Sequence, residues 1–295
     1  MVAVPVDKSL AEFIGKKGSE NGITHYNRKV DGNVIVALAP TNLEEKFYSL
    51  AEIMLISGQV LLSTAVIDKT FGESLIGAAL LDRHVILTDD NDVQKMLAGS
   101  GIRDFEVVPR EKLLERITNS KPAEPAGSLR IDIDKSFSVK GIGAVALGIV
   151  TRGRLRVHDK LLHNSGKVVE VKSIQAQDVD IKEAEPGTRV GLALKGMDST
   201  ELEKGDILAA SAVKKAKSVK LKLQFSPFAA EEMKEGSRYM LAVGFSHSIA
   251  TLSNTKEATF SLERPISAER GEKALLMRES SPRIFASGEV TEITS

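Results

Sequence analysis

The stretch from Arg130 to Leu208 contains three segments, RIDIDKSFSVKGIGAVALGIVTRGRLRVHDKLL (Arg130–Leu162), VVEVKSIQAQDVDIKEAEPGTRVGLALKGM (Val168–Met197) and LEKGDIL (Leu202–Leu208). In these segments, short runs rich in valine, isoleucine and leucine are separated by glycines, at Gly141, Gly143, Gly148, Gly153, Gly166, Gly187, Gly191, Gly196 and Gly205. Short apolar runs between turn residues are typical of β-strands. The stretch therefore predicts a small antiparallel β-barrel.

Upstream of this stretch, strand and helix patterns alternate. The predicted strands are Val34–Leu38, Val60–Val66, His84–Leu87 and Phe105–Val108, and the predicted helices are Leu43–Ile56, Gly72–Leu81, Asp92–Leu97 and Arg110–Ile117. Such alternation predicts a parallel sheet covered by helices. Helix patterns nearly vanish further along the chain, where a second strand-rich stretch, Val219–Ile293, follows the first.

The chain is therefore predicted to be multidomain, with an α/β domain followed by two antiparallel β-barrels. The segment KPAEPAGS (Lys121–Ser128) reads as a linker. The predicted boundaries are an α/β domain at 1–118, a linker at 119–128, one barrel at 129–212 and a second barrel at 217–295.

Composition and charge exclude several classes of protein. The 295 residues include no cysteine, so disulfides and thiolate chemistry are excluded. No apolar run approaches the roughly 20 residues that span a bilayer, and no secretory signal is apparent, so we expect a cytoplasmic protein. The formal net charge is zero, with a net of −4 up to residue 118 and +4 after it. This mildly basic C-terminal part falls short of a dedicated nucleic-acid binder.

The same residues carry a family resemblance. The segments IDKSF, VKGIGAVALGIVTRGRLRVHDKL and QDVDIKEAEPGTRVGLALKGM resemble the second domain of translational GTPases, elongation factor Tu and its relatives. The segment ATFSLERPISAERGEKALLMRESSPRIFASGEV (Ala258–Val290) resembles the closing strands of their third domain. The closest likeness is to the archaeal selenocysteine-specific factor and the pyrrolysine-associated paralogue. The resemblance implies GTP and Mg²⁺ as cofactors, and tRNA, the ribosome or another translation factor as partners.

The N-terminal part lacks the phosphate-binding residues that this resemblance implies. A P-loop needs G-x-x-x-x-G-K-[ST], whose glycines let backbone N–H groups surround the phosphates. Here Val2–Val4 leads to a helix near Ser9–Ile14 through VAVPVDKSLAEFIG, which has no glycine before Gly15. The Asp-x-x-Gly motif that should follow the third strand has Ala37 at its aspartate position.

The guanine-reading Asn-Lys-x-Asp motif is also absent. Its positions hold Thr88, Asp89, Asp90 and Asn91, so an acidic Asp89 replaces the lysine that should cover the base. The cluster of Asp89, Asp90 and Asp92 can be read as a cation site, but a solvated loop that caps the next helix, with Asn91 or Asp92 as N-cap, is favoured. We therefore expect no cofactor, no metal and no GTPase activity.

One motif of the family survives in the segment GKKGSENGITHYN (Gly15–Asn27). It resembles the switch segment of the pyrrolysine-associated paralogue, in which Gly22, Ile23 and Thr24 correspond to the Gly-Ile-Thr whose threonine binds magnesium. Without a phosphate or a metal, Thr24 has nothing to coordinate. The GKKG turn, Gly15–Gly18, can be read as a phosphate-binding turn, but a plain helix C-cap in a surface loop is favoured.

The first barrel carries the candidate RNA-binding residues. Family relatives border their pocket for the aminoacyl end of tRNA with strands and turns that match Lys172, Gln175, Gln177, Asp178 and Arg189. Lys172, Gln175 and Arg189 are the candidates for binding that end or a phosphate. The alternative, which has the greater weight, is that they form ordinary surface ion pairs.

No catalytic residue is predicted. The five histidines show no metal-ligand spacing, and no G-x-S-x-G motif is present. The leading interpretation is a translation-factor relative that binds tRNA or another part of the translation machinery without GTP. The alternatives are a protein-interaction adaptor outside translation, and a GTP-binding factor with an unconventional site.

Overall fold

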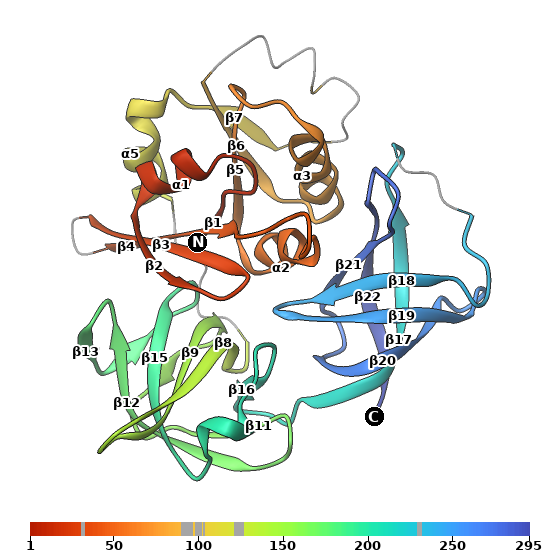
Figure 1. The fold of residues 1–295 in the computed structure, drawn as a ribbon. Helices are drawn as coiled ribbons and strands as arrows, with labels where there is room; N and C mark the ends of the chain where they lie inside the picture. The colour runs from red at the N-terminus through yellow and green to blue at the C-terminus, as the bar shows by residue number, and fades with distance from the viewer. Residues whose placement is uncertain (31–32, 90–96, 98–101, 103, 121–126, 229–231) are drawn as a thin grey trace.

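The chain folds into three units that meet one another (Figure 1). The computed structural model describes residues 1–295 except 31–32, 90–96, 98–101, 103, 121–126 and 229–231. We call the units the α/β unit (residues 2–118), the middle barrel (130–209) and the C-terminal barrel (214–294). This order of one α/β unit and two strand-rich units confirms the fold class expected from the sequence.

The α/β unit begins with a very short strand and alternates strands with helices. Its elements are β1 (Val2–Ala3), α1 (Lys8–Ile14), β2 (Lys16–Glu20), β3 (Ile23–Val30), β4 (Asn33–Pro40), α2 (Tyr48–Ile56), β5 (Gln59–Ser63), α3 (Lys69–Leu80), β6 (His84–Thr88), β7 (Phe105–Val107), the 3-10 turn η1 (Arg110–Lys112) and α5 (Leu113–Thr118). Of the predicted helix Asp92–Leu97, only Leu97 lies within the described residues.

The seven strands of this unit form one sheet in the order β2-β3-β4-β1-β5-β6-β7. Strands β4, β1, β5, β6 and β7 are parallel neighbours, but β2, β3 and β4 pair antiparallel, so the sheet is mixed rather than wholly parallel. Helices α2 and α3 pack on one face and α1 and α5 on the other. Burial on both faces explains why the central strands read as continuous apolar runs.

Two N-terminal segments differ from their predicted structures. The strand predicted at Val34–Leu38 continues to Pro40, so Ala37 lies inside β4, directly opposite Val2 of β1. The helix C-cap expected in the GKKG segment is confirmed, because Gly15 caps α1 and its backbone N–H donates to the carbonyl of Ala11. The expected surface loop is wrong, since Lys16–Glu20 form the edge strand β2. A side chain at Gly15 would lie 2.8 Å from the backbone of Asn27, so this close pairing favours glycine.

The middle barrel consists of β8 (Arg130–Val139), β9 (Gly143–Arg152), β10 (Leu155–Arg156), β11 (Lys160–His163), β12 (Val168–Ala176), β13 (Val179–Ile181), β14 (Glu183–Ala184), β15 (Arg189–Lys195), the 3-10 turn η2 (Ser199–Glu201) and β16 (Ile207–Ala209). The main sheet has the order β11-β16-β8-β9-β15-β12-β13, and β11 also pairs with β12, which closes the ring. Gly148 is required where β9 pairs with β8, because a Cβ there would lie 2.6 Å from the carbonyl oxygen of Asp132.

The C-terminal barrel is a closed ring of six strands in the order β17-β20-β19-β18-β21-β22. The strands are β17 (Lys214–Phe225), β18 (Arg238–Val243), β19 (Ser246–Asn254), β20 (Thr259–Ala268), β21 (Lys273–Met277) and β22 (Ile284–Thr294). The first strand begins at Lys214, three residues before the predicted boundary at 217. Its sequence, KKAKSVKLKLQF, alternates lysine with apolar residues, so one face packs into the barrel while the lysines lie outside.

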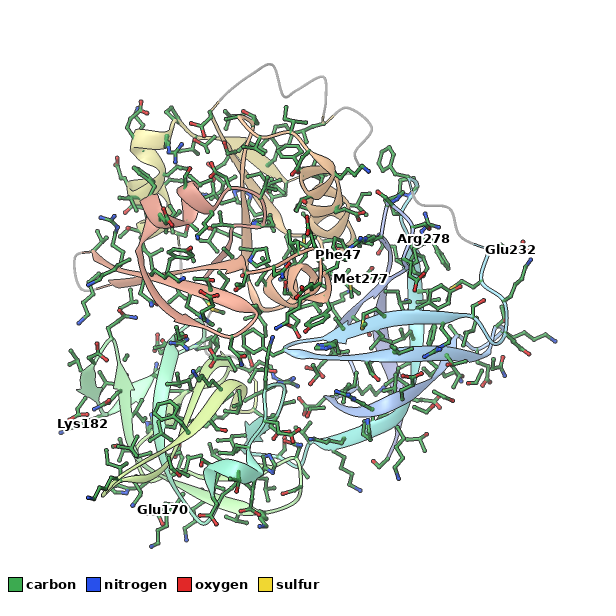
Figure 2. The ribbon with its side chains drawn as sticks, viewed as in Figure 1. Phe47, Glu170, Lys182, Glu232, Met277 and Arg278 are labelled. Atoms are coloured by element: carbon green, nitrogen blue, oxygen red, sulfur yellow. The ribbon has the colours of Figure 1, made fainter. Side chains whose placement is uncertain are left out.

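The α/β unit and the C-terminal barrel share one apolar core. Side chains of α2, including Leu50 and Met54, belong to the same buried cluster as Phe245, Leu275 and Ile284 of the barrel. Figure 2 shows Phe47 and Met277 close together at this junction. Continuous apolar burial of this kind resembles an obligate interface more than a transient one between domains.

Candidate functional site

The connection from β1 to α1 lies where a P-loop would bind phosphate. Only four residues, Val4 to Asp7, join the two elements. The carboxylate of Asp7 accepts hydrogen bonds from the backbone N–H groups of Ser9, at 2.8 Å, and Leu10, at 3.2 Å. Free N–H groups at a helix start are what a phosphate binds. In this chain a carboxylate of the chain itself already occupies them.

Lys8 and Ser9 form the first turn of α1, which is the place of the Lys-[Ser/Thr] end of a P-loop. The sequence analysis did not single them out, because the glycines that normally precede this pair are missing. The Ser9 hydroxyl donates to Asp7 at 2.7 Å and accepts from Arg110 at 3.3 Å. The serine is therefore engaged with neighbouring side chains.

The segment that resembles the family's switch motif is part of the sheet. Thr24 lies on β3, opposite Ala39 of β4, and its side chain is almost completely buried. Its hydroxyl lies 3.1 Å from that of Thr41, so the two threonines form a hydrogen bond. Gly22 precedes the strand with φ of +73°, a conformation that glycine adopts without strain. Gly22, Ile23 and Thr24 are thus fixed by strand pairing.

The residues predicted to correspond to the family's base-reading motif begin at the end of β6. Thr88 is fully buried, and Asp89 accepts a hydrogen bond from the Ser63 hydroxyl at 2.8 Å. Arg110 lies 3.7 Å from the same carboxylate. Asp90, Asn91 and Asp92 lie outside the described residues. The Asp89 carboxylate therefore binds protein groups at the position where the family uses a lysine.

Arg189 lies in a buried network between the α/β unit and the middle barrel. Its guanidinium donates to Asp134, at 2.9 Å, and to the Ser19 hydroxyl of β2, at 2.7 Å. His25 of β3 approaches the same Asp134 carboxylate at 3.1 Å. The side chains of His25 and Asp134 are 3% and 5% exposed, so the surface ion pair considered for Arg189 is not what the structure contains. Arg189 fixes the switch-like segment onto the barrel.

Electrostatics in this network follow from burial and charge. Burial lowers the pKa of His25, so the imidazole is neutral at physiological pH. Burial alone would raise the pKa of Asp134, but hydrogen bonding to His25 and the charge of Arg189 hold it below its ordinary value. Asp134 is therefore an anion that pairs with one cation, Arg189, inside the interface.

All three units meet at Glu52 of α2, whose side chain is fully buried. Its carboxylate binds Lys204 of the middle barrel at 2.6 Å and His247 of the C-terminal barrel at 2.9 Å. The Tyr48 ring stacks on His247 with a centroid distance of 3.6 Å. A second buried carboxylate, Glu73 of α3, accepts from the backbone N–H of Ile284 at 2.9 Å. These contacts hold the helices of the α/β unit against both barrels.

The sequence analysis missed both glutamates. Their ligands come from parts of the chain 152 to 211 residues away, which no local pattern reveals. The available signal was a single glutamate in the otherwise apolar helix segment YSLAEIMLI. A charge in such a segment indicates a buried partner.

The other candidate RNA-binding residues lie on the exposed side of the middle barrel. On β12, the Lys172 ammonium lies 3.3 Å from the carbonyl of Ile142, and the Gln175 amide donates to Asp180 at 2.9 Å. Gln177 and Asp178 form the turn to β13, both with positive φ. Lys172 and Gln175 are thus both exposed on β12, whereas Arg189 is enclosed in the interface. Their role in binding RNA stays a prediction.

Within the part of the chain that the structure describes, no three His, Cys, Asp or Glu side chains come together in a way that could bind a metal ion. In the same described part, none of the helices has the length and apolar character needed to cross a membrane.

Comparisons with known proteins agree with this architecture. The family model for elongation factor Tu domain 2 matches residues 143–209. The uncharacterized protein MJ0325 of Methanocaldococcus jannaschii is 31% identical over 299 residues, which are 96% of each chain. Elongation factor 1-alpha of Thermofilum pendens is 42% identical over 80 residues, which are 27% of this chain and 18% of that factor.

Solved structures share the whole fold at low identity. The translation elongation factor SelB from Methanococcus maripaludis, in complex with the GTP analogue GppNHp, matches 99% of this chain and 79% of its own, with a TM-score of 0.81 and 17% identity. A bacterial selenocysteine-specific elongation factor, EF-Sec, matches 98% of this chain and 58% of its own, with a TM-score of 0.78 and 16% identity.

Proposed function

We propose that this chain, which belongs to the translational GTPase-like family close to the selenocysteine-specific elongation factors, is a translation-factor relative that binds RNA without GTP. The observation that carries the first part of the proposal is the Asp7 cap on α1. A nucleotide phosphate there would have to displace the Asp7 carboxylate from the backbone N–H groups, and the two negative charges would repel each other. Phosphoryl transfer depends on a P-loop, its lysine and Mg²⁺, and no P-loop glycine is present to bring backbone N–H groups around the phosphates.

The buried networks support a fixed arrangement of the three units. In a nucleotide switch, the γ-phosphate and Mg²⁺ order the switch segments, which are released on hydrolysis. Here Thr24 is paired within the sheet, Arg189 joins that region to the middle barrel, and Glu52 joins α2 to both barrels. We therefore expect the arrangement of the units to be independent of GTP analogues.

RNA is the proposed partner because the fold that relatives use in translation is kept, and because the second half of the chain is mildly basic. Lys172 and Gln175 project from the exposed side of the middle barrel, so they are the groups available to a phosphate or a base. Contacts to phosphates release counterions, so binding through them weakens steeply as the salt concentration rises.

Gel shifts with total tRNA at increasing salt test this proposal. We expect a saturable complex whose affinity falls steeply as the salt concentration rises. For Lys172→Gln, we expect the slope of log affinity against log salt concentration to become shallower by about one phosphate contact. Lys16→Gln, which removes an exposed lysine from β2, is the matched control and should leave the affinity and its salt dependence unchanged. If no complex forms at low salt, RNA binding is wrong and a protein-interaction role takes its place.

A further inference from the structure

The outer surface of the C-terminal barrel carries a row of apolar side chains that faces α2. Met277 of β21 is paired with Met240 of β18, and Met240 is paired with Ile249 of β19. Met240 and Ile249 are only half-buried, so α2 does not cover the row completely. Methionine side chains adapt their shape and are frequent at surfaces that accept varied apolar groups.

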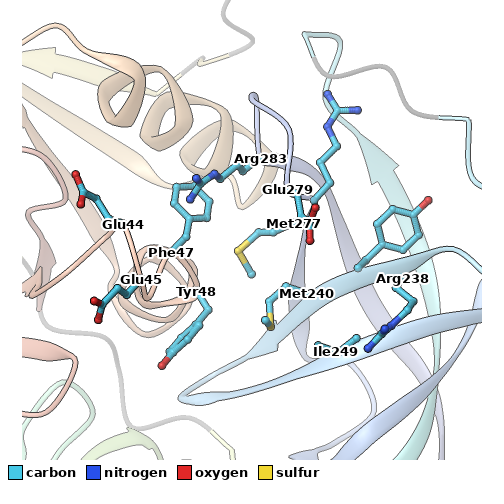
Figure 3. A pocket seen from close by; sticks show the side chains of 12 residues that line it. Glu44, Glu45, Phe47, Tyr48, Arg238, Met240, Ile249, Met277, Glu279 and Arg283 are labelled. Atoms are coloured by element: carbon cyan, nitrogen blue, oxygen red, sulfur yellow. The ribbon is translucent and has the colours of Figure 1, made fainter.

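Two aromatic residues form the opposite wall. Phe47 and Tyr48 lie at the start of α2, and both are half-buried. One face of Tyr48 stacks on His247, and the Arg283 guanidinium lies 4.6 Å from the centre of the Phe47 ring. The space between this wall and the apolar row is a groove of about 570 Å³, seen in Figure 3. Its volume is in the range of small-molecule sites.

The rim of the groove leaves negative charge without a counterion. Glu44 and Glu45 lie on the α2 side and Glu279 on the barrel side, as Figure 3 shows. All three are exposed, and among the described residues none of them takes part in an ion pair. Three arginines also line the groove and are engaged differently. Arg238 pairs with Glu263, Arg283 lies over the Phe47 ring, and Arg278 lies over the Phe285 ring.

We propose that this groove binds a small organic cation, an amine that carries an apolar or aromatic body. The body would lie on the row of Met277, Met240 and Ile249, beside Tyr48. The ammonium group would meet the carboxylates of the rim, and the face of an aromatic ring favours a cation as well. Because the walls come from two units, such a ligand binds only while the α/β unit and the C-terminal barrel stay together, and it stabilises that arrangement.

A pair of fluorescent probes tests the proposal. Dansylcadaverine carries an aromatic body, a flexible chain and a terminal amine, and dansyl-6-aminohexanoate replaces the amine with a carboxylate. We expect saturable binding of the cationic probe to the full chain, about tenfold tighter than that of the anionic probe, because each exposed charge pair changes affinity by up to about fivefold.

Variants assign the binding to the groove. The triple variant Glu44→Gln, Glu45→Gln and Glu279→Gln keeps the side-chain sizes and should remove the preference for the cation, whereas Met240→Ser should weaken both probes. Glu183→Gln, an exposed carboxylate on the middle barrel, is the control and should bind like the wild type. Circular dichroism confirms that each variant is folded.

Three results would overturn the proposal. The first is equal affinity for the two probes, which would show that only apolar contacts with the dansyl group hold them. The second is unchanged binding of the cationic probe to the folded triple variant, which places the site elsewhere. The third is no saturable binding of the cationic probe at millimolar concentration.

Discussion

Replacing Glu52 with glutamine tests the three-unit junction directly. The carboxylate is fully buried and binds Lys204 at 2.6 Å and His247 at 2.9 Å. Removing one partner of a buried ion pair costs about 3–5 kcal/mol, because the remaining charge is left without a counterion. The side chains of Lys204 and His247 are 20% and 30% exposed, so both can be partly hydrated in the variant. We therefore expect a loss of about 3 kcal/mol in the free energy of unfolding, at the lower end of that range.

Urea unfolding followed by circular dichroism measures this loss, and a double-mutant cycle with Lys204→Met isolates the pair. We expect a coupling energy of about 2 kcal/mol between the two positions, since residues in one buried ion pair are not independent. Glu45→Gln, an exposed glutamate just before the same helix, should change the stability by less than about 0.5 kcal/mol. The reasoning is refuted if Glu52→Gln is as mild as that control, or if the coupling energy is near zero.

Three further predictions concern other parts of the fold. Asp7→Ala removes the cap of α1 and should lower the free energy of unfolding by about 0.5–2 kcal/mol in urea titrations; no change would show that the cap is dispensable. Gly148→Ala places a methyl group 2.6 Å from a backbone oxygen and should destabilise the middle barrel by about 1–3 kcal/mol or more, whereas wild-type stability would contradict this close pairing of β9 with β8. Although burial raises the pKa of Asp206, hydrogen bonds from His163, the Glu203 backbone and Lys215 hold it at about 2, below its ordinary 3.8. The Asp206 carboxylate therefore contributes about 2 kcal/mol to the free energy of unfolding above pH 4, and this contribution is lost as the pH falls towards 2. The stability difference between wild type and Asp206→Asn should shrink over that pH range, and a constant difference would contradict this prediction.

The two barrels were predictable because strands and turns leave patterns in short stretches of sequence. Glycine spacing and short apolar runs indicate strands and turns. The strand order was not predicted, because it includes pairs that are not neighbours along the chain, such as β17 with β20 and β9 with β15. In the α/β unit, the apolar strand beginning at Val34 was predicted, but β2 was not, because KKGSE has no apolar alternation. That segment is a strand only because its backbone pairs with β3.

For the candidate site, the sequence predicted which family residues are missing. The sequence shows that glycines are missing before α1 and that residues 88–91 depart from the family motif. It does not show which side chains of the chain bind at those two places in the fold. Asp7 caps the helix, and Asp89 binds Ser63, through contacts that depend on the folded geometry. Arg189 was identified as a candidate for binding RNA, but its partners Ser19 and Asp134 were not, because they lie 170 and 55 residues away in the chain.

Isothermal titration of the purified chain with GTP and Mg²⁺ tests the central claim most directly. Our account predicts no heat of binding at micromolar to millimolar nucleotide, because the start of α1 is capped by Asp7 and no P-loop glycine is present. Saturable binding with a micromolar dissociation constant would contradict it, and would show that the chain holds a nucleotide through groups other than those of a P-loop.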